Sequence, residues 1–303
     1  MHLGSGRALH EVDVDPVVGE EHRCAQTDRA AADYQNRAHG FPSNVGTLFP
    51  RLGTLYPHIT MGAMAEEGTV VWNRERRAPR RQSLDVDRIV AASVALADAE
   101  GLDALSMRRV AADLGTGTTS LYRHVAGRDE LVDLMTDAVQ GEAPPVALTG
   151  DWRSDLRAVA HRQRAALLCH PWLGPVMATR PALGPNSLRQ MDTALGAAGA
   201  LTDDITLASD VMAVVVDYVV GAVSRELAEL QARRRTGITE QEWRASVGPY
   251  IRQVVASGEY PRFARRVVEA ADHTAEELFA FGLSCVLDGI AARVASSPPT
   301  AGP

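Results

Sequence analysis

Residues 106–124 constrain the fold of this 303-residue chain more than any other stretch. Apolar residues recur there at helical spacing on both sides of a short turn at 114–116, which predicts two short helices with one buried face each. The apolar positions are Val110, Ala111 and Leu114, then Leu121 and Val125. Ser106 stands where an N-cap side chain accepts a backbone N–H, and Gly115 supplies the left-handed conformation that ends the first helix. This arrangement predicts a helix-turn-helix, whose second helix enters the major groove of DNA.

The outward face of the second predicted helix is rich in hydrogen-bonding groups and holds no carboxylate. Its residues are Thr118, Thr119, Ser120, Tyr122, Arg123 and His124. A surface facing bulk water normally includes Asp or Glu, whereas a surface for phosphates and base edges excludes them. Double-stranded DNA is therefore the expected partner.

Flanking segments extend the pattern into a small helical domain. A preceding helix with one apolar face is expected to end near Glu100, with Gly101 as its stop. A following helix opens at Gly127, and acidic residues in its first turn suit the helix dipole. The residues expected to point inward on that helix are Leu131, Leu134, Met135 and Ala138.

This block, residues 85 to about 140, resembles the DNA-binding domain of the tetracycline-repressor family of bacterial regulators. The resemblance rests on Ile89-Val90, Gly101-Leu102, Ser106, Val110-Ala111, Leu114-Gly115, Ser120-Leu121-Tyr122-Arg123-His124 and Asp129-Glu130-Leu131. Agreement in order and spacing over this length is far more specific than one short motif.

The resemblance implies a role for each polar residue of the motif. Base edges are contacted from the positions of Arg108, Thr118, Thr119 and Arg123. Phosphates are contacted from the positions of Ser106, Ser120, Tyr122, His124 and Arg128. Two alternatives stay open: one of Arg108 and Arg109 is ordinary solvated surface, because adjacent helical residues point about 100° apart, and His124 is a capping or packing imidazole.

Positive charge is concentrated around this domain, although the chain has a net charge of −7. Residues 74–128 carry ten arginines against seven acidic residues, so the remainder of the chain carries −10. Arg80 and Arg81 belong to a basic segment that suits an arm on phosphates or in the minor groove. A solvated basic linker is the alternative.

Residues 1–63 show no sustained apolar period, and we expect them to be disordered. One hypothesis is that translation starts at Met61 or Met64; the other is that the extension is functional. The expected organisation is an extension over 1–63, a basic arm over 64–84, the helix-turn-helix domain over 85–141, a helical regulatory and dimerisation domain over 151–295, and a disordered tail over 296–303.

The second domain is also predicted to be helical, which makes the chain all-α. Asp151 can cap a helix that ends near Cys169, and Thr239 and Thr274 open capping boxes. Two long helices are expected, one that starts at Thr202-Asp203-Asp204 and reaches about Leu230, and one that runs through Leu278 and ends near Ala295. Both are apolar on more than one face and need burial. In the family the corresponding helices form a dimer interface, which predicts a homodimer; a purely intramolecular core is the alternative. Dimerisation also suits a palindromic operator.

The stretch from 166 to 181 resembles the regulatory domain of the same family, through Ala-Leu-Leu-x-His and Thr-Arg-Pro elements. Met177 lies where the chelating pattern places a magnesium-binding His, and Met does not bind magnesium. We therefore expect no metal and no cofactor. Candidate residues for an apolar ligand pocket are Trp172, Met177, Met191, Met212 and Tyr218; plain core positions are the alternative.

The segments together predict a cytoplasmic, homodimeric transcription regulator, a repressor that a small-molecule effector of unknown identity releases from its operator. No secretory signal and no membrane span are expected. The alternatives are a helical-bundle enzyme, or a ligandless structural dimer, with an attached DNA-binding domain. We see no nucleophile–base pair or phosphate loop, so the chain is not expected to be an enzyme.

Overall fold

The computed structural model describes Trp72, residues 84–177 and residues 183–296. Within these ranges the chain forms helices and no β-strand, which confirms the predicted all-α class. The predictions for residues 1–63, for the arginine-rich arm and for the end of the C-terminal tail lie outside the described residues.

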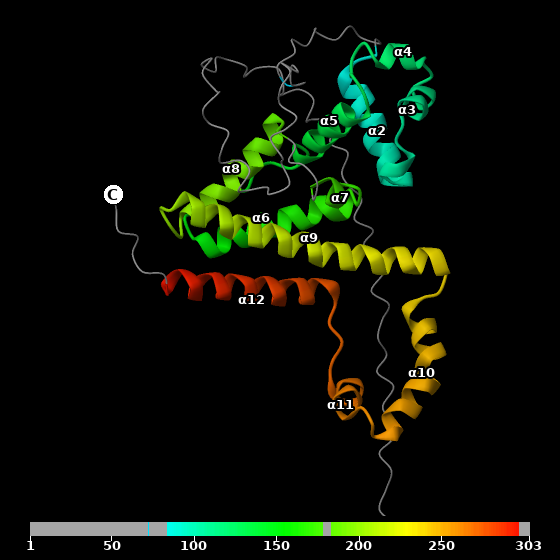
Figure 1. Ribbon diagram of the computed structural model, residues 1–303, viewed down its shortest axis with the longest axis vertical. Coiled ribbons are helices and arrows are strands. Elements are labelled where there is room, and N and C mark those ends of the chain that lie inside the picture. The colour runs from blue at the N-terminus through cyan, green and yellow to red at the C-terminus, as the bar shows by residue number, and fades with distance from the viewer. Residues whose placement is uncertain (1–71, 73–83, 178–182, 297–303) are drawn as a thin grey trace, which may run out of the picture.

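The first group of helices forms a compact unit at one end of the molecule (Figure 1). It contains α2 (Val86–Glu100), a 3-10 turn η4 (Leu102–Ala104), α3 (Met107–Asp113), α4 (Thr118–Leu121) and α5 (Arg128–Gln140). Asp85 caps α2 by accepting the backbone N–H of Arg88 at 2.8 Å, and Gly101 ends the helix at φ 84°. The side chains of Ile89, Leu121 and Leu131 are fully buried in the core of this unit.

Helix α5 is buried on more sides than the sequence predicts. Leu131, Leu134 and Met135 are buried as expected, but Ala138 is exposed, so its inward assignment was wrong. The helix contacts α2 on one side and α8 (Pro185–Gly199) on another. Because it lies between two helices, α5 buries a broader face than a single apolar stripe indicates.

The second group forms a bundle beneath the first. It contains α6 (Trp152–Cys169), α7 (Leu173–Met177), α8, α9 (Ile205–Thr236) and α12 (Ala275–Ala295). The side chain of Asp151 accepts the backbone N–H of Arg153 at the start of α6, and Thr274 forms the predicted capping box with Glu277 before α12. Polar contacts also tie the bundle together: Arg164 of α6 pairs with Glu226 of α9 and Glu276 of α12.

A helical arm projects away from the bundle between α9 and α12 (Figure 1). It consists of α10 (Glu240–Ser257), which opens with the predicted Thr239 capping box, and α11 (Pro261–Glu269). The two helices contact each other. Their large apolar side chains, among them Trp243, Tyr250 and Val268, are exposed.

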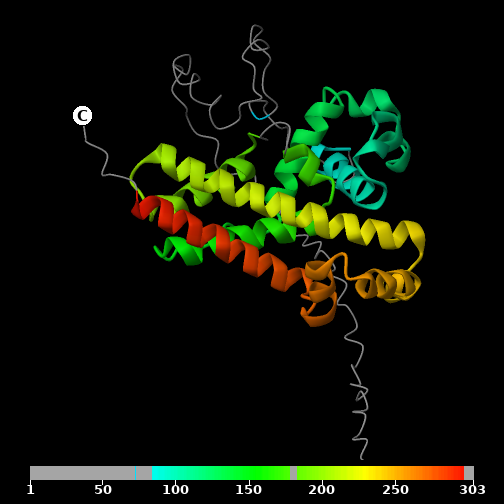
Figure 2. The ribbon, with the colours of Figure 1, turned by 60° about the horizontal axis from the view of Figure 1, so that its bottom comes forward.

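Helices α9 and α12 lie side by side along the length of the bundle (Figure 2). Val215, Val219, Leu283 and Leu287 are buried between elements, whereas Phe281 is 71% exposed. By length and composition alone, α9 over 205–232 and all of α12 could cross a membrane. This is weak evidence for a span, because the core helices of soluble proteins pass the same test.

Candidate DNA interface and ligand cavity

The predicted helix-turn-helix is formed by α3, the turn at 114–117 and α4. The Ser106 hydroxyl accepts the backbone N–H of Arg109 at 3.2 Å, and Ser106 is the N-cap of α3. Gly115 has φ 63°, the left-handed conformation that a side chain disfavours. Leu121 and Val125 are fully buried, so they fix the orientation of α4 against the domain core.

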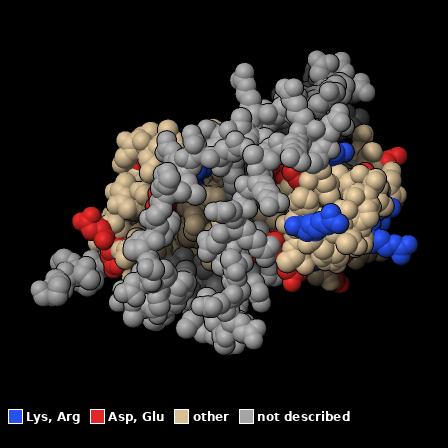
Figure 3. Space-filling model, turned by 90° about the horizontal axis from the view of Figure 1, so that it is seen from above, with Lys and Arg blue, Asp and Glu red and all other residues tan. Residues whose placement is uncertain are grey.

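The polar side chains of the α4 segment line the exposed edge of this domain. Thr119, Tyr122 and Arg123 are exposed, and Thr118, Ser120 and His124 are half-buried. The regular helix ends at Leu121, and residues 122–124 continue as a turn. The space-filling view from above shows arginines on the described surface of the unit formed by α2 to α5, which we call the DNA-binding unit after its predicted role, among mostly uncharged atoms (Figure 3).

The two adjacent arginines of α3 differ in their partners. Arg109 pairs with Glu100 at 2.7 Å and with Asp113 at 3.1 Å. Arg108 is exposed and makes no ion pair within the described residues. Arg109 therefore fits the solvated-surface alternative, and the guanidinium of Arg108 is available to a partner.

Two of the predicted phosphate contacts also have a role inside the domain. The Arg128 guanidinium donates to the carbonyls of Leu105 at 3.1 Å and Leu102 at 2.9 Å, and so fastens α5 to the loop before α3. The Ser106 oxygen serves the α3 cap, while its hydroxyl proton can still be donated outward. Arg80 and Arg81 lie outside the described residues.

Helix α5 is bonded to the bundle at its C-terminal end. The Asp137 carboxylate accepts the backbone N–H of Ser187 at 2.8 Å, in the first turn of α8. The carbonyl of Gln140 accepts the Arg162 guanidinium of α6 at 2.7 Å and the Gln190 amide of α8 at 3.3 Å. One helix therefore joins the helix-turn-helix to both α6 and α8.

A buried histidine makes a second link between the two units. His170, 3% exposed, follows α6; its Nδ1 lies 2.9 Å from Asp98 of α2 and its Nε2 lies 3.0 Å from Glu142. Burial opposes protonation, but the hydrogen bonds and charges of the two carboxylates outweigh it and raise the pKa of His170 to about 9. The Trp172 indole also donates to Asp98, at 2.7 Å. We call His170, Asp98, Glu142 and Trp172 the junction cluster.

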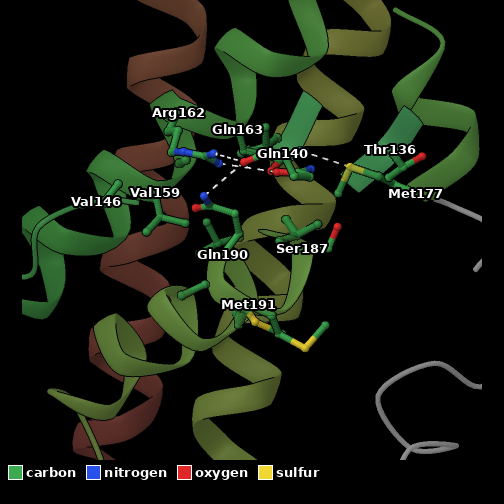
Figure 4. Close-up of a pocket in the computed structure, with 16 residues that line it drawn as sticks. Thr136, Gln140, Val146, Val159, Arg162, Gln163, Met177, Ser187, Gln190 and Met191 are labelled. Atoms are coloured by element: carbon green, nitrogen blue, oxygen red, sulfur yellow. Dashed lines mark hydrogen bonds between the residues drawn. The ribbon is translucent and has the colours of Figure 1, made fainter. Parts of the chain in front are cut away.

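A cavity of about 130 Å³ lies among α5, α6, α8 and α9 (Figure 4). Its apolar lining consists of Val146, Val159, Ala160, Met177, Met191, Ala194, Met212, Val215, Val216 and Val219. Its polar lining consists of Thr136, Gln140, Arg162, Gln163, Ser187 and Gln190. No His, Asp or Glu is found among these described lining residues, so a metal would find no strong ligand on them.

Three of the five residues proposed for the pocket face this cavity, namely Met177, Met191 and Met212. Trp172 and Tyr218 do not, and we correct their placement. Trp172 is buried in the junction cluster. The Tyr218 hydroxyl donates to the carbonyl of Phe279 at 2.7 Å, so that side chain joins α9 to α12.

The polar residues of the cavity were missed in the sequence. Thr136, Arg162 and Ser187 come from three helices, and no local spacing links them. The signal that the sequence offered was a polar residue within a helix that also carries apolar residues. Such polar residues are far more often solvent-exposed than turned toward a cavity. Only the packing of the helices shows that these face inward.

Comparison with known proteins agrees with this architecture. Residues 89–135 match the family model described as bacterial regulatory proteins, tetR family, and residues 144–294 match the tetracyclin repressor-like C-terminal domain. The chain is 43% identical over 241 residues to the HTH-type transcriptional repressor DrrR1 of Streptomyces coeruleorubidus, covering 77% of this chain and 88% of that protein.

More distant relatives and solved structures extend the comparison. The tetracycline repressor protein class A of Escherichia coli is 29% identical over 222 residues, which cover 69% of this chain and 92% of that protein. The crystal structure of the Streptomyces coelicolor TetR family protein ActR in complex with actinorhodin aligns with a TM-score of 0.56 at 28% identity, covering 70% of this chain and 97% of that one. With its helix-turn-helix, its helical second domain and these matches, the chain belongs to the tetR family of bacterial regulatory proteins.

Proposed function

We propose that this protein is a homodimeric transcriptional repressor that binds a palindromic DNA operator and is released from it by a small molecule. The observation that carries the proposal is the exposed α4 surface, rich in hydroxyl and cationic groups, on a domain that α5 joins to a ligand-sized cavity. The proposed setting is the cytoplasm, and the proposed action is binding without catalysis.

Within this function the arginines and hydroxyls of the motif divide into two groups. Arg108, Thr118, Thr119 and Arg123 read base edges, and Arg123 is suited to a bidentate contact with guanine. Ser106, Ser120, Tyr122, His124 and Arg128 position the domain on phosphates. Arg80 and Arg81 add an arm along the backbone or the minor groove.

Ligand control operates through α5. Its N-terminal half lies in the DNA-binding unit, and its last turn is held by Arg162 and Gln190, which both line the cavity. A ligand that favours one position of this helix shifts the population between DNA-competent and incompetent dimers. A ligand with equal affinity for the two states would leave their populations unchanged.

Dimerisation is supported by the exposed apolar side chains of α9 and α12, such as Val214 and Phe281. Pairing these faces buries them and sets the distance between two recognition helices. Relatives support the ligand step: ActR has been crystallised with actinorhodin, a small molecule.

Selection of bound sequences from a random DNA duplex pool, with the full chain, tests this function. We expect enrichment of one palindromic motif with two half-sites. Enrichment of a single half-site would contradict binding as a dimer. No enrichment by folded protein would overturn the regulator function. Turnover of a small molecule, or operator binding that no small molecule alters, would instead favour the enzyme or the ligandless dimer.

A further inference from the structure

We propose that two copies of this chain pack with their α9 helices antiparallel and centred on Gly221, so that Asp217 of each copy forms an ion pair with Arg225 of the partner subunit. This inference rests on the proposed homodimer and adds its register, that is, which residues of the two copies meet. Three properties of α9 support it: two opposite charges without an ion pair, their symmetric placement about a glycine, and the position of that glycine beside α12.

The two charges stand on a stretch of α9 that is otherwise almost entirely apolar. Asp217 is the single charged residue from Val211 to Ser224, and Arg225 follows directly after that stretch. Both side chains are exposed, and neither makes an ion pair within the described residues. They are eight positions apart, about 12 Å along the helix, so they do not pair within one copy.

Their placement about Gly221 is symmetric. Asp217 lies four residues before Gly221 and Arg225 lies four residues after it, and residues four apart share one face of a helix. When a two-fold axis passes an antiparallel helix pair, each residue before the axis meets the equally distant residue after it on the partner subunit. An axis at Gly221 therefore sets two opposite-charge pairs face to face, and it sets Val214 opposite Ala228 of the partner subunit.

The glycine itself is not required by the packing within one copy. Gly221 is exposed, and a Cβ there would meet no atom within 4 Å. On α12, by contrast, a Cβ at Gly282 would collide with the ring of Tyr218. A glycine inside a helix is less stable than an alanine, and its benefit is that another backbone can approach closely. Gly221 is therefore suited to the point where a helix of the second copy comes nearest.

This point is continuous with the apolar face already assigned to the dimer. The Tyr218 hydroxyl, which comes from the turn of α9 before Gly221, donates to the carbonyl of Phe279 at 2.7 Å. Helices α9 and α12 lie side by side (Figure 2), so Gly221 and the exposed Phe281 lie close in height along the two helices. A contact centred on Gly221 covers both.

Charge reversal in the full chain tests the register, with the dimer dissociation constant measured by sedimentation at several protein concentrations. Asp217→Arg sets two arginines opposite each other twice in each dimer, and Arg225→Asp does the same with two acids. We expect each variant to raise the dissociation constant about tenfold or more, because like charges that face each other across an interface are costly.

An equimolar mixture of the two variants is the decisive sample. In the mixed dimer both pairs are again of opposite sign, so association should recover to within about twofold of the unmodified chain. Mixing cannot restore a pair that forms within one copy, so recovery identifies a contact between copies. Asp210→Arg is the matched control: it reverses another exposed acidic residue of α9, and mixing it with Arg225→Asp should give no recovery.

Filling the crossing point gives a second readout that involves no charge. Gly221→Leu should also raise the dissociation constant about tenfold or more, because the backbones can no longer approach, while Gly199→Leu, at an open position on α8, should leave it unchanged. Helix content of every variant is checked by circular dichroism.

The outcomes separate the register from the proposed function. An unmodified chain that stays monomeric would overturn the proposed dimer together with this inference. A dimer that tolerates both charge reversals, or weakened variants that do not recover on mixing, would overturn the register alone and leave the dimeric regulator intact.

Discussion

Two adjacent residues of the same type can have different roles, because the side chains around them differ. Arg108 and Arg109 both lie exposed on α3, but only Arg109 has Glu100 and Asp113 within reach of its guanidinium. Exposed ion pairs contribute little to stability, about 0–1 kcal/mol, yet they occupy the donors that a DNA partner would need. Arg123 makes no ion pair in the described part of the chain either, so its guanidinium is available for the proposed contact with DNA.

We predict that Arg123→Ala relaxes base preference at one position of each half-site. Loss of a bidentate arginine–guanine contact costs about 1–3 kcal/mol of discrimination, which competition binding with single-base operator variants would measure. Arg109→Ala is the matched control and should leave base preference unchanged. Equal weakening on all sequences by Arg123→Ala would contradict the base-reading role.

A glycine at the start of α8 allows the close approach of α5. Gly184 has an ordinary φ of −73°, but a Cβ there would lie 2.3 Å from the Asp137 carboxylate. We predict that Gly184→Ala lowers the free energy of unfolding by about 1–3 kcal/mol, since the contact must be displaced. Gly199→Ala, with open space around its Cβ, is the control in denaturant titration. Equal stability of the two variants would show that Asp137 does not constrain this site.

At the scale of elements, α5 and the end of α6 connect the helix-turn-helix unit to the helical bundle. The Asp137 and Gln140 contacts fix α5 to the bundle, and the junction cluster fixes α2 to the end of α6. In the chain, His170 lies 72 positions from Asp98 and 28 positions from Glu142. A regulator that moves its DNA-binding unit must keep or break such contacts as a set, because each bonded partner restrains the others.

The junction cluster predicts a pH dependence of stability. Because the pKa of His170 is raised to about 9, its contribution is complete below about pH 6.5, the ordinary histidine value. It is lost as the pH rises through 9. We expect His170→Gln to lower the free energy of unfolding by about 1–2 kcal/mol near pH 6.5. Denaturant titrations at several pH values should show this difference shrinking toward pH 10, and a constant difference would contradict a charged junction.

At the scale of the whole molecule, apolar surface left exposed by one chain indicates assembly. Helices α9 and α12 lie alongside each other (Figure 1), and their exposed apolar side chains, among them Val214 and Phe281, are the candidate dimer face. A monomer with such a face would be prone to association. We therefore assign the face to the proposed dimer.

We predict that Phe281→Asp raises the dissociation constant of the dimer by on the order of tenfold or more, because an aromatic residue near the centre of an interface is a typical hot spot. Sedimentation at several protein concentrations measures it, and binding to the palindromic operator should weaken in parallel. Leu188→Asp, at an exposed position on α8, is the control. An unchanged dimer in Phe281→Asp would place the interface elsewhere.

The sequence by itself determined the helices and the DNA-binding motif of this protein. Capping residues such as Ser106, Thr239 and Thr274, and the left-handed Gly115, act on their own neighbours in the chain, so local patterns predict them. The exposed α4 surface follows from the same local periodicity, since a helix with one buried face exposes the other.

The tertiary structure alone decided which polar residues face the cavity and which groups join the two units. Thr136 and Ser187 lie about fifty positions apart in the chain, and His170 lies 72 positions from its partner Asp98. Residues this far apart produce no periodic pattern in the sequence that would reveal their proximity. Ala138 was misplaced because the side of a helix that becomes buried depends on which neighbours pack against it. Trp172 was misplaced because its indole, in the turn after α6, donates to Asp98 of the distant helix α2. Local chemistry fixes the elements, and the contacts between distant elements fix the site.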